Sequence, residues 1–272
     1  MELIKAIVLG IIQGLSEFLP ISSSGHLVIF SELLNFVDKG LAFDVFVHFG
    51  TLVAVVVVFW RDIWQMIVTL PGLPGFIARG MKINDEADRY RALALFIVIG
   101  SIPAGVIGVL FEDTIEQVFH SPVFALVMLL VTAVILWTSR YPKERESFMN
   151  SKHALAIGFA QAFAIIPGIS RSGSTIVTGL WMGLNRELAA RFSFLMSVPV
   201  IFGATLLKFK HMLEVPPPAS QITNLIGGTL AAAISGYFAI IWLLDIVRKK
   251  RLEYFAYYCA AVGIIGLLIL LG

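Results

Sequence analysis

Polar and ionisable side chains interrupt the first hydrophobic stretch of the chain. The segment FLPISSSGH, residues 18–26, places three serines, a glycine and a histidine directly after Glu17, which follows Gln13 by four positions. This spacing puts Gln13 and Glu17 on one helix face. An acid in such a segment can act as a general base or bind a divalent cation, with Gln13 orienting its carboxylate. The alternative for Glu17 is a buried, neutral, hydrogen-bonded carboxyl.

A hydroxyl beside an imidazole is the arrangement of an activated nucleophile. Ser23 and His26 are three positions apart, so a helix that begins after the turn carries both on one face. His26 could also protonate a leaving oxygen, or it could only cap the helix. At this point the sequence does not distinguish the nucleophile among Ser22, Ser23 and Ser24.

A second polar turn, PGISRSGS at residues 167–174, contains a lone arginine, Arg171. Arginine is costly inside a membrane and needs an anionic partner. A guanidinium forms forked hydrogen bonds, and a helix that begins near Ser172 presents its positive end. These features favour an oxyanion such as phosphate as the ligand, whereas the alternative is a structural salt bridge to Glu17. The turn offers a ligand these further groups: Gly168, Ser170, Ser172, Gly173, Ser174 and Thr175.

A nucleophile, a base and an arginine together indicate hydrolysis of a phosphate compound. A diphosphate carries more negative charge than one arginine and two helix ends neutralise, so a divalent metal near Glu17 would complete the site. Asp44 and His48, four residues apart, either support the site or serve as capping groups. The sequence has no P-loop, no HExxH and no paired cysteines, which argues against nucleotide-driven and zinc-dependent chemistry.

The two polar turns correspond to each other in sequence. Residues 10–26 align with residues 158–174 without a gap, and Ser23 then falls on Arg171, which suggests that this position is specialised. Such a match at one fixed offset indicates an internal duplication. The aligned identities are Gly10 with Gly158, Gln13 with Gln161, Ile21 with Ile169, Ser22 with Ser170, Ser24 with Ser172, and Gly25 with Gly173.

The duplication predicts how the chain is organised. We expect one integral membrane domain, 1–272, with repeat 1 at about 1–147 and repeat 2 at about 148–272. Each repeat begins with a broken helical hairpin, made of two apolar pieces too short to cross a bilayer alone. These re-entrant hairpins are predicted at about 3–34 and 153–183, and three spans follow each of them.

The composition is that of a polytopic membrane protein. Hydrophobic residues make up 58% of the chain and charged residues only 14%. Several apolar runs approach the roughly 20 residues that a helix needs to cross a bilayer. We predict an all-α fold, an inverted-topology repeat with about six transmembrane helices and two re-entrant hairpins. Polar breaks, the longest from Arg61 to Arg91, separate runs at about 41–60, 92–111, 121–138, 188–207, 222–247 and 254–271.

Charge placement predicts the orientation in the membrane. Three spans per half place the second half upside down relative to the first, and most of the lysines and arginines then fall in loops on one side. That side is predicted to be cytoplasmic. Both termini are then periplasmic, the first hairpin opens outward and the second opens to the cytoplasm. The other side carries only Lys5, Lys39, Lys208 and Lys210.

Inverted repeats with interrupted helices bring their breaks together near the middle of the membrane. Because non-helical backbone at that depth must be buried in protein or line a wet cavity, we expect both turns to face one pocket. A lipid or anion transporter is the competing interpretation, since it would use Arg171 and Glu17 for binding without a nucleophile. The chain has no long basic tract, and no nucleic-acid partner is expected.

At these motifs the chain resembles the undecaprenyl-diphosphate phosphatase family of the bacterial inner membrane, the bacitracin-resistance type. The (E/Q)xxxE motif of that family is Gln13 to Glu17 here, and it leads into the serine-rich turn that ends in Gly25 and His26. Glutamine at position 13 leaves Glu17 as the only carboxylate of the motif. The second signature, PGxSRSxxT, is complete as Pro167, Gly168, Ser170, Arg171, Ser172 and Thr175.

The resemblance implies removal of the terminal phosphate from undecaprenyl diphosphate, which regenerates the lipid carrier for cell-wall precursors. It also implies a polyprenyl diphosphate substrate, surrounding membrane lipid, a site that opens to the periplasm, and dependence on Mg²⁺ or Ca²⁺. By the same resemblance Ser23 is the nucleophile, and Glu17 and His26 have acid–base or metal-binding roles. The choice between monomer and homodimer stays open. The implied phosphate clamp is Arg171 with Ser170, Ser172 and Thr175.

Overall fold

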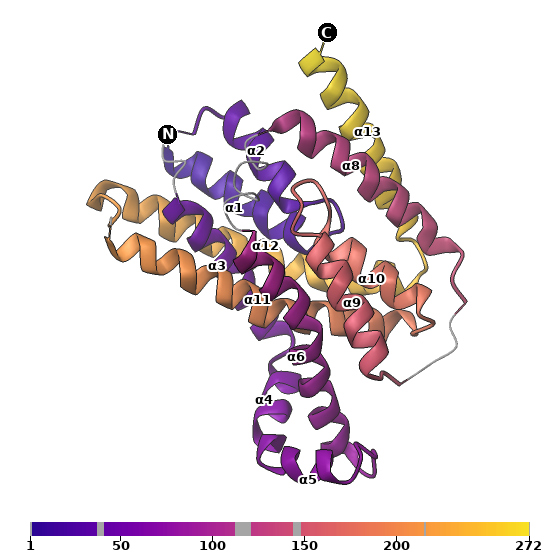
Figure 1. The fold of residues 1–272 in the computed structure, drawn as a ribbon. Helices are drawn as coiled ribbons and strands as arrows, with labels where there is room; N and C mark the ends of the chain where they lie inside the picture. Colours follow the sequence, from indigo (N-terminus) through magenta and orange to yellow (C-terminus); the bar gives the residue numbers. More distant parts are fainter. Residues whose placement is uncertain (1, 37–40, 112–120, 144–147, 215, 272) are drawn as a thin grey trace.

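The computed structural model is an all-helical chain in the parts that it describes (Figure 1). Three sequence predictions lie wholly or partly outside these parts: the polar break before the run at 41–60, the break between the runs at 92–111 and 121–138, and the repeat seam near residue 147. The described residues are 2–36, 41–111, 121–143, 148–214 and 216–271.

At each predicted hairpin the structure has two helices separated by a turn. The first half of the chain forms α1 (Glu2–Phe18), α2 (Ser23–Leu33), α3 (Leu41–Val58), α4 (Trp60–Thr69), α5 (Leu73–Ala78), α6 (Glu86–Leu110) and α8 (Pro122–Trp137). The second half forms α9 (Ser151–Phe163), α10 (Arg171–Trp181), α11 (Arg186–Glu214), α12 (Ile222–Arg248) and α13 (Glu253–Leu271). The pairs α1–α2 and α9–α10 are therefore the broken elements.

Five helices in the described part of the chain are long and apolar enough to cross a bilayer, namely α6, α8, α11, α12 and α13. A sixth candidate is α3 together with α4 and α5, which pass the same test as one span bent by 76°. The five helices and α3 coincide with the six predicted apolar runs, whereas α4 and α5 extend beyond the run at 41–60. The chain is an all-α polytopic membrane protein.

The predicted polar break at 61–91 contains more helix than the sequence pattern suggests. Within it, α4 packs Ile63 and Met66 against the core and leaves Trp60 and Trp64 exposed. Two short helical elements follow, and α6 already begins before the apolar run at residue 92. The early start is stabilised by Asp88, whose buried carboxylate accepts hydrogen bonds from two arginines. Because the two arginines balance the charge of Asp88, the charged segment before residue 92 can be the first part of the apolar helix α6.

The two halves pack by exchanging helices. α1 lies along α12 and α3, whereas α9 lies along α6, and α8 pairs with α13. The first helix of each hairpin contacts a spanning helix of the other half through a glycine: α1 contacts α12, and α9 contacts α6. A Cβ on Gly10 would lie 2.2 Å from the backbone oxygen of Gly228, and one on Gly158 would lie 2.5 Å from that of Gly100. Small residues at both contacts let the helix backbones approach closely.

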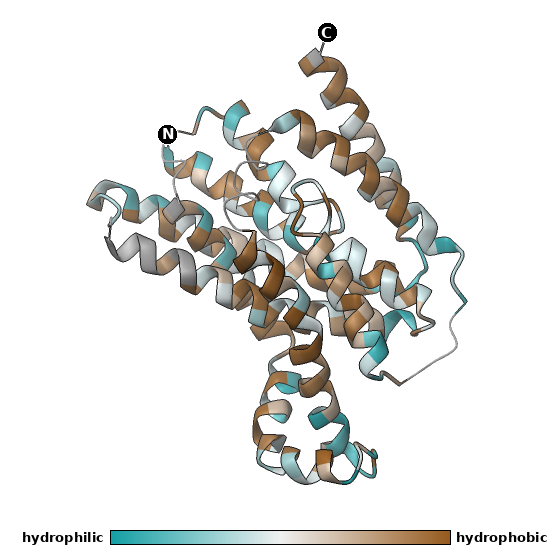
Figure 2. Ribbon diagram, viewed as in Figure 1, coloured by the Kyte–Doolittle hydropathy of each residue, from teal (hydrophilic) through white to brown (hydrophobic). Residues whose placement is uncertain are grey.

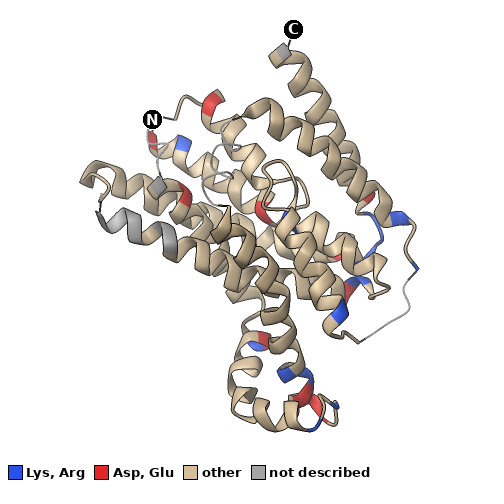
Figure 3. Cartoon of the chain, viewed as in Figure 1, with Lys and Arg blue, Asp and Glu red and all other residues tan. Residues whose placement is uncertain are grey.

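Apolar side chains cover the outer faces, and charge gathers at one end. In Figure 2, α8 and α13 are largely brown along their outer surfaces, and Leu268 and Ile269 of α13 are 69% and 74% exposed. Such a surface suits lipid as its solvent. Most lysines and arginines lie around α4–α5 and the lower ends of α8, α9 and α12 (Figure 3). The first turn of α1 and the last turn of α13 lie on the upper side in Figure 1.

Candidate active site

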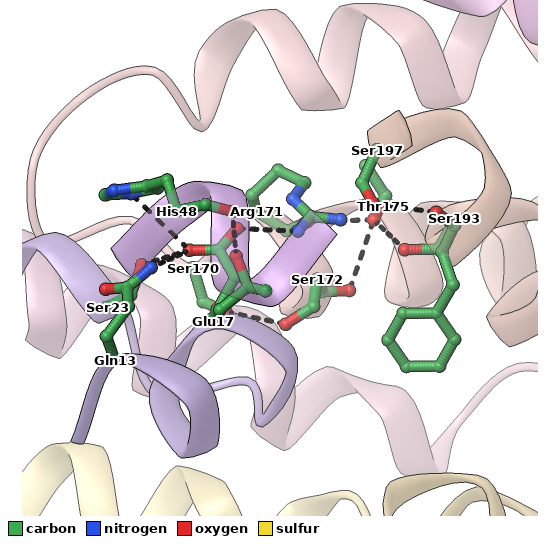
Figure 4. A network of polar contacts seen from close by, with 12 residues as sticks. Gln13, Glu17, Ser23, His48, Ser170, Arg171, Ser172, Thr175, Ser193 and Ser197 are labelled. Carbon is green, nitrogen blue, oxygen red and sulfur yellow. Dashed lines mark hydrogen bonds and ion pairs between the residues drawn. The ribbon is translucent and has the colours of Figure 1, made fainter. Parts of the chain in front are cut away.

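The two polar turns meet inside the molecule. Arg171 at the start of α10 donates from Nη2 to Oε1 of Glu17 near the end of α1, over 2.8 Å (Figure 4). Beside this pair is a cavity of about 350 Å³. The sequence predicted that the turns face a single pocket, and the structure brings them together. The cavity wall combines α1, α2 and α3 of the first half with α9, α10 and α11 of the second.

The first turn is short and strained. Ser22 precedes α2 and has a φ of 70°, a conformation that residues with a Cβ rarely adopt. Its hydroxyl lies 3.3 Å from that of Ser24. Because α2 begins directly after Ser22, Ser23 occupies the first helical position and projects toward α1. Strain of this kind is common at functional sites, where the surrounding structure maintains it.

The second turn is held by one buried threonine. Thr132 of α8 donates its hydroxyl to the carbonyl of Gly168 over 2.8 Å and accepts the backbone N–H of Ser170 over 3.0 Å. Ser170 is the N-cap of α10, since its Oγ accepts the backbone N–H of Gly173. α10 therefore starts at Arg171, one residue before the predicted position near Ser172.

Glu17 is the centre of the polar network in Figure 4. Its Oε2 accepts hydrogen bonds from Ser23 Oγ at 2.7 Å and from Gln13 Nε2 at 3.1 Å, while Arg171 occupies Oε1. His48 Nε2 lies 3.9 Å from Oε2. The Glu17 side chain is only 9% exposed, and the carboxylate is thus held in one orientation by groups from α1, α2, α3 and α10.

This arrangement can activate a serine next to an anion site. A hydroxyl within hydrogen-bond reach of a carboxylate can transfer its proton as it attacks. The guanidinium of Arg171 and the N-terminus of α10 supply positive charge for phosphate oxygens. A second guanidinium nitrogen of Arg171, Nη1, has no hydrogen-bond partner among the described residues. The salt bridge to Glu17 therefore leaves donor capacity on the arginine.

The predicted site residues divide into those that line the cavity and those that lie behind its wall. Glu17, Ser22, Ser23, Ser24, Ser170 and Arg171 line it, together with Asp44 and His48. The other predicted binding residues are absent from the described part of the cavity wall. Several of them are fully buried within α1 or α10. These residues are Gln13, Gly168, Ser172, Gly173, Ser174 and Thr175.

Thr175 is an example of a residue behind the cavity wall that holds the lining residues in place. Its hydroxyl lies 2.6 Å from Ser193 Oγ of α11 and donates to the carbonyl of Arg171 over 2.8 Å. The threonine therefore ties the first turn of α10 to α11. Ser172 Oγ lies 3.3 Å from Ser170 Oγ, which it can support in the same way. Their contribution in this structure is to position Ser170 and Arg171.

His26 points away from the cavity, and the wall formed by described residues does not include it. Its Nδ1 lies 2.9 Å from the carbonyl oxygen of Ser22, and its Nε2 lies 2.8 Å from the hydroxyl of Tyr258. The imidazole also stacks on the Tyr258 ring of α13. The expected pairing of Ser23 with His26 is not formed, because the first turn of α2 directs Ser23 toward Glu17.

With the geometry in place, comparison with known proteins identifies the family. The model described as "Bacitracin resistance protein BacA" matches residues 6–265. The chain belongs to this family. A protein of Halothermothrix orenii named "Undecaprenyl-diphosphatase" is 48% identical over 97% of this chain and 96% of its own length. One of Methanosphaera stadtmanae with the same name is 41% identical over 99% of this chain and 98% of its own length.

In this BacA-family chain, a divalent cation would find one carboxylate beside the serine. No group of three or more His, Cys, Asp or Glu side chains suited to a metal occurs within the described ranges. Glu17 is already bonded to Arg171, Ser23 and Gln13. The Oε1 atom of Gln13 is buried, and no described group pairs with it. A cation at this cavity would therefore take most of its ligands from a bound diphosphate and few from the described side chains.

Four residues near the site were missed by sequence reasoning. Thr132 and Ser193 are small hydroxyls inside apolar helices, and Tyr258 lies 232 positions from its partner His26, so no local pattern indicated them. Gln161 is different, because the repeat alignment already placed it on Gln13. That correspondence could have marked Gln161 as a second amide at the site.

Proposed function

We propose that the chain hydrolyses undecaprenyl diphosphate to undecaprenyl phosphate and orthophosphate. The observation that carries this proposal is the serine–carboxylate pair, Ser23 with Glu17, set against Arg171 in a cavity of a membrane protein. The relatives named undecaprenyl-diphosphatase support the same reaction and the same lipid. The length of the polyprenyl chain is taken from their names.

In the proposed reaction Ser23 attacks the terminal phosphorus of the diphosphate. The proton of its Oγ passes to Oε2 of Glu17, and the bond between the terminal phosphorus and the bridging oxygen breaks. The bonding electron pair leaves with the lipid monophosphate, which takes the proton from Glu17, so that the carboxylate is unprotonated again. Water then attacks the phosphoserine with Glu17 as base, releasing orthophosphate and restoring the Ser23 hydroxyl.

The phosphoryl oxygens are bound by groups that the second turn positions in advance. Arg171 offers a planar fork, and Ser170 lines the cavity at the N-terminus of an 11-residue helix. Donors fixed by the fold stabilise the charge of the transition state without reorganising, which makes them effective catalysts. Thr132 and Thr175 contribute indirectly, because they fix the backbone from which these donors project.

We further propose that the substrate is used with Mg²⁺ or Ca²⁺, held through Glu17, the cavity carboxylate that bonds Ser23. Such an ion, when bound, would offset the charge of the diphosphate and favour departure of the lipid phosphate. Glu17 would keep its contacts to Ser23 and Arg171 through the same two oxygens.

The proposal places the enzyme in the bacterial inner membrane with its cavity open to the periplasm and both termini on that side. Support comes from the lysine and arginine distribution, since basic residues collect on cytoplasmic faces. Recycling of the lipid carrier at this face would serve cell-wall synthesis and fits a family named for bacitracin resistance. The predicted two repeats, 1–147 and 148–272, belong to the same proposal.

Release of orthophosphate from farnesyl diphosphate by the purified protein tests the reaction, with Mg²⁺, with Ca²⁺ and with EDTA. We expect release with the cations, little with EDTA, and loss of turnover in Ser23→Ala with binding retained. Ser101→Ala, which removes a hydroxyl of α6 that bonds only the carbonyl of Ile97 among described groups, should behave as wild type.

Two results would contradict the proposal at different levels. No orthophosphate from the wild-type protein under any cation condition would favour a carrier that binds without hydrolysis. Full turnover in Ser23→Ala would leave the reaction in place and exclude serine as the nucleophile, which would favour direct attack by water.

A further inference from the structure

Gln161 of α9 is a buried amide in the cavity wall. Its side chain is 1% exposed, and it lines the same cavity as Glu17, Ser23 and Arg171. Neither Nε2 nor Oε1 of this amide has a hydrogen-bond partner within the described part of the protein. Buried polar groups are nearly always paired, so an amide with both atoms unpaired requires an explanation.

The duplicated sequence explains how this amide differs from its counterpart. Gln13 in α1 donates from Nε2 to Glu17, the residue four positions later on the same face. The residue four positions after Gln161 is Ile165, which lines the cavity but accepts no hydrogen bond from a side chain. The second half therefore keeps the glutamine and lacks the acid that occupies its donor in the first half.

The charges around the cavity indicate what the amide binds. Glu17 and Asp44 bring negative charge to the wall, and Arg171 brings positive charge. Within the described chain, Nη1 of Arg171 is a second buried donor without a partner. Unpaired N–H groups on α9 and α10 in one cavity suit an anion with several acceptor oxygens. A neutral amide adds a donor without the cost of burying another charge.

We propose that Gln161 binds the substrate headgroup, donating from Nε2 to a non-bridging oxygen of the diphosphate. The inference rests on the proposed function and extends it to a residue outside both signature motifs. In this role Gln161 contributes to substrate affinity, whereas Ser23 and Glu17 carry out the bond exchange. Its Oε1 faces the water or protonated phosphate oxygen that accompanies the headgroup.

The test compares two substitutions with a control on the same helix. Gln161→Met keeps the length of the side chain and removes both polar atoms, and Gln161→Glu keeps the shape and adds a repelling charge. Phe159→Leu changes a residue of α9 that is 58% exposed, outside the cavity wall. We expect KM for farnesyl diphosphate to rise about 10- to 100-fold in Gln161→Met, and further in Gln161→Glu, with Phe159→Leu unchanged.

Affinity is also measured without turnover, by binding of the methylenediphosphonate analogue of farnesyl diphosphate, whose P–C–P link cannot be hydrolysed. The same loss of affinity is expected here, with a Tm for Gln161→Met at or above that of the wild type, because an unpaired amide has been removed. This readout holds even if the wild-type protein proves not to release orthophosphate. Wild-type KM and analogue affinity in Gln161→Met would overturn the inference, as would a lower Tm with unchanged affinity.

Discussion

At the scale of single residues, Glu17 connects the two halves of the site. The sequence allowed two interpretations of Arg171, a salt bridge to Glu17 or a clamp for a phosphate, and the structure forms the salt bridge while leaving donor capacity for a phosphate. Nη2 bonds Glu17, while Nη1 has no partner among the described residues. A buried ion pair contributes little net stability, because desolvation offsets the attraction. Its value here is orientation, since the pair fixes both the base and the arginine.

This dual role predicts that Arg171→Lys is severely impaired although it keeps the positive charge. A lysine ammonium is a point charge and cannot bond Glu17 and a phosphate through one planar fork. We expect kcat/KM to fall by about 10²-fold or more, the scale of losing one fixed transition-state donor. Arg248→Lys is the matched control, because Arg248 also pairs with an acid, Glu187, but on the surface. Equal activity of Arg171→Lys and wild type would make Arg171 a structural residue.

At the scale of elements, the position of Arg171 depends on the turn before α10. Gly168 has a φ of 90°, and a Cβ there would lie 2.1 Å from the backbone oxygen of Ala125. Neither the backbone conformation nor the space allows a side chain. The turn can therefore be tight enough to bring Ser170 against Thr132 and to start α10 at the cavity.

We accordingly predict that Gly168→Ala lowers Tm and abolishes activity. The left-handed backbone alone costs about 1–2 kcal/mol with a Cβ, and the contact with Ala125 adds to this. Gly105→Ala in α6 is the control, because a Cβ there meets no described atom within 4 Å and alanine favours a helix by about 0.5–1 kcal/mol. Thermal unfolding in detergent, with turnover measured on the same samples, compares the two. A Tm for Gly168→Ala equal to that of Gly105→Ala would contradict this account of the turn.

The elements and the centre of the site could be predicted from the sequence because both depend on local patterns. Apolar runs marked the six spans, and the polar turns marked the breaks that carry Glu17, Ser23 and Arg171. Apart from the ion pair of Glu17 with Arg171, which the sequence offered as one alternative, partners far apart in the chain could not be predicted. His26 bonds Tyr258 of α13 rather than its neighbour Ser23, since the orientation of its ring depends on which helix packs there.

The extra helices of the 61–91 segment were missed for a related reason. Charge and proline in this segment suggest a loop, but pairing with two arginines offsets much of the cost of burying the Asp88 carboxylate. Asp88 is fully buried, with Arg91 at 2.7 Å and Arg79 at 3.1 Å. Which arginines lie beside an acid depends on the folded chain. From residue type alone, an aspartate is expected to be exposed.

At the scale of the whole molecule, helices at corresponding places in the two predicted repeats pack against the opposite half of the chain. Gly10 and Gly158 align in the two repeats, and each lies against a glycine in a spanning helix of the opposite half, Gly228 of α12 or Gly100 of α6. Equivalent helices thus make equivalent contacts across the molecule. In an inverted repeat this exchange brings the two broken hairpins to a common centre, where the Glu17 carboxylate meets the second turn.

The same symmetry leads to a prediction about orientation. If the halves are inverted and basic loops stay in the cytoplasm, the loop between α5 and α6 is cytoplasmic and the segment before α12 is periplasmic. Lys82 and Ser220 are exposed positions in these two segments. In spheroplasts, a membrane-impermeant maleimide should label Ser220→Cys, whereas Lys82→Cys should react only in inverted vesicles. The wild-type protein is the control, because its single cysteine, Cys259, is buried and should not react. Labelling of Lys82→Cys from outside would reverse the orientation and place the Ser23 cavity on the cytoplasmic side.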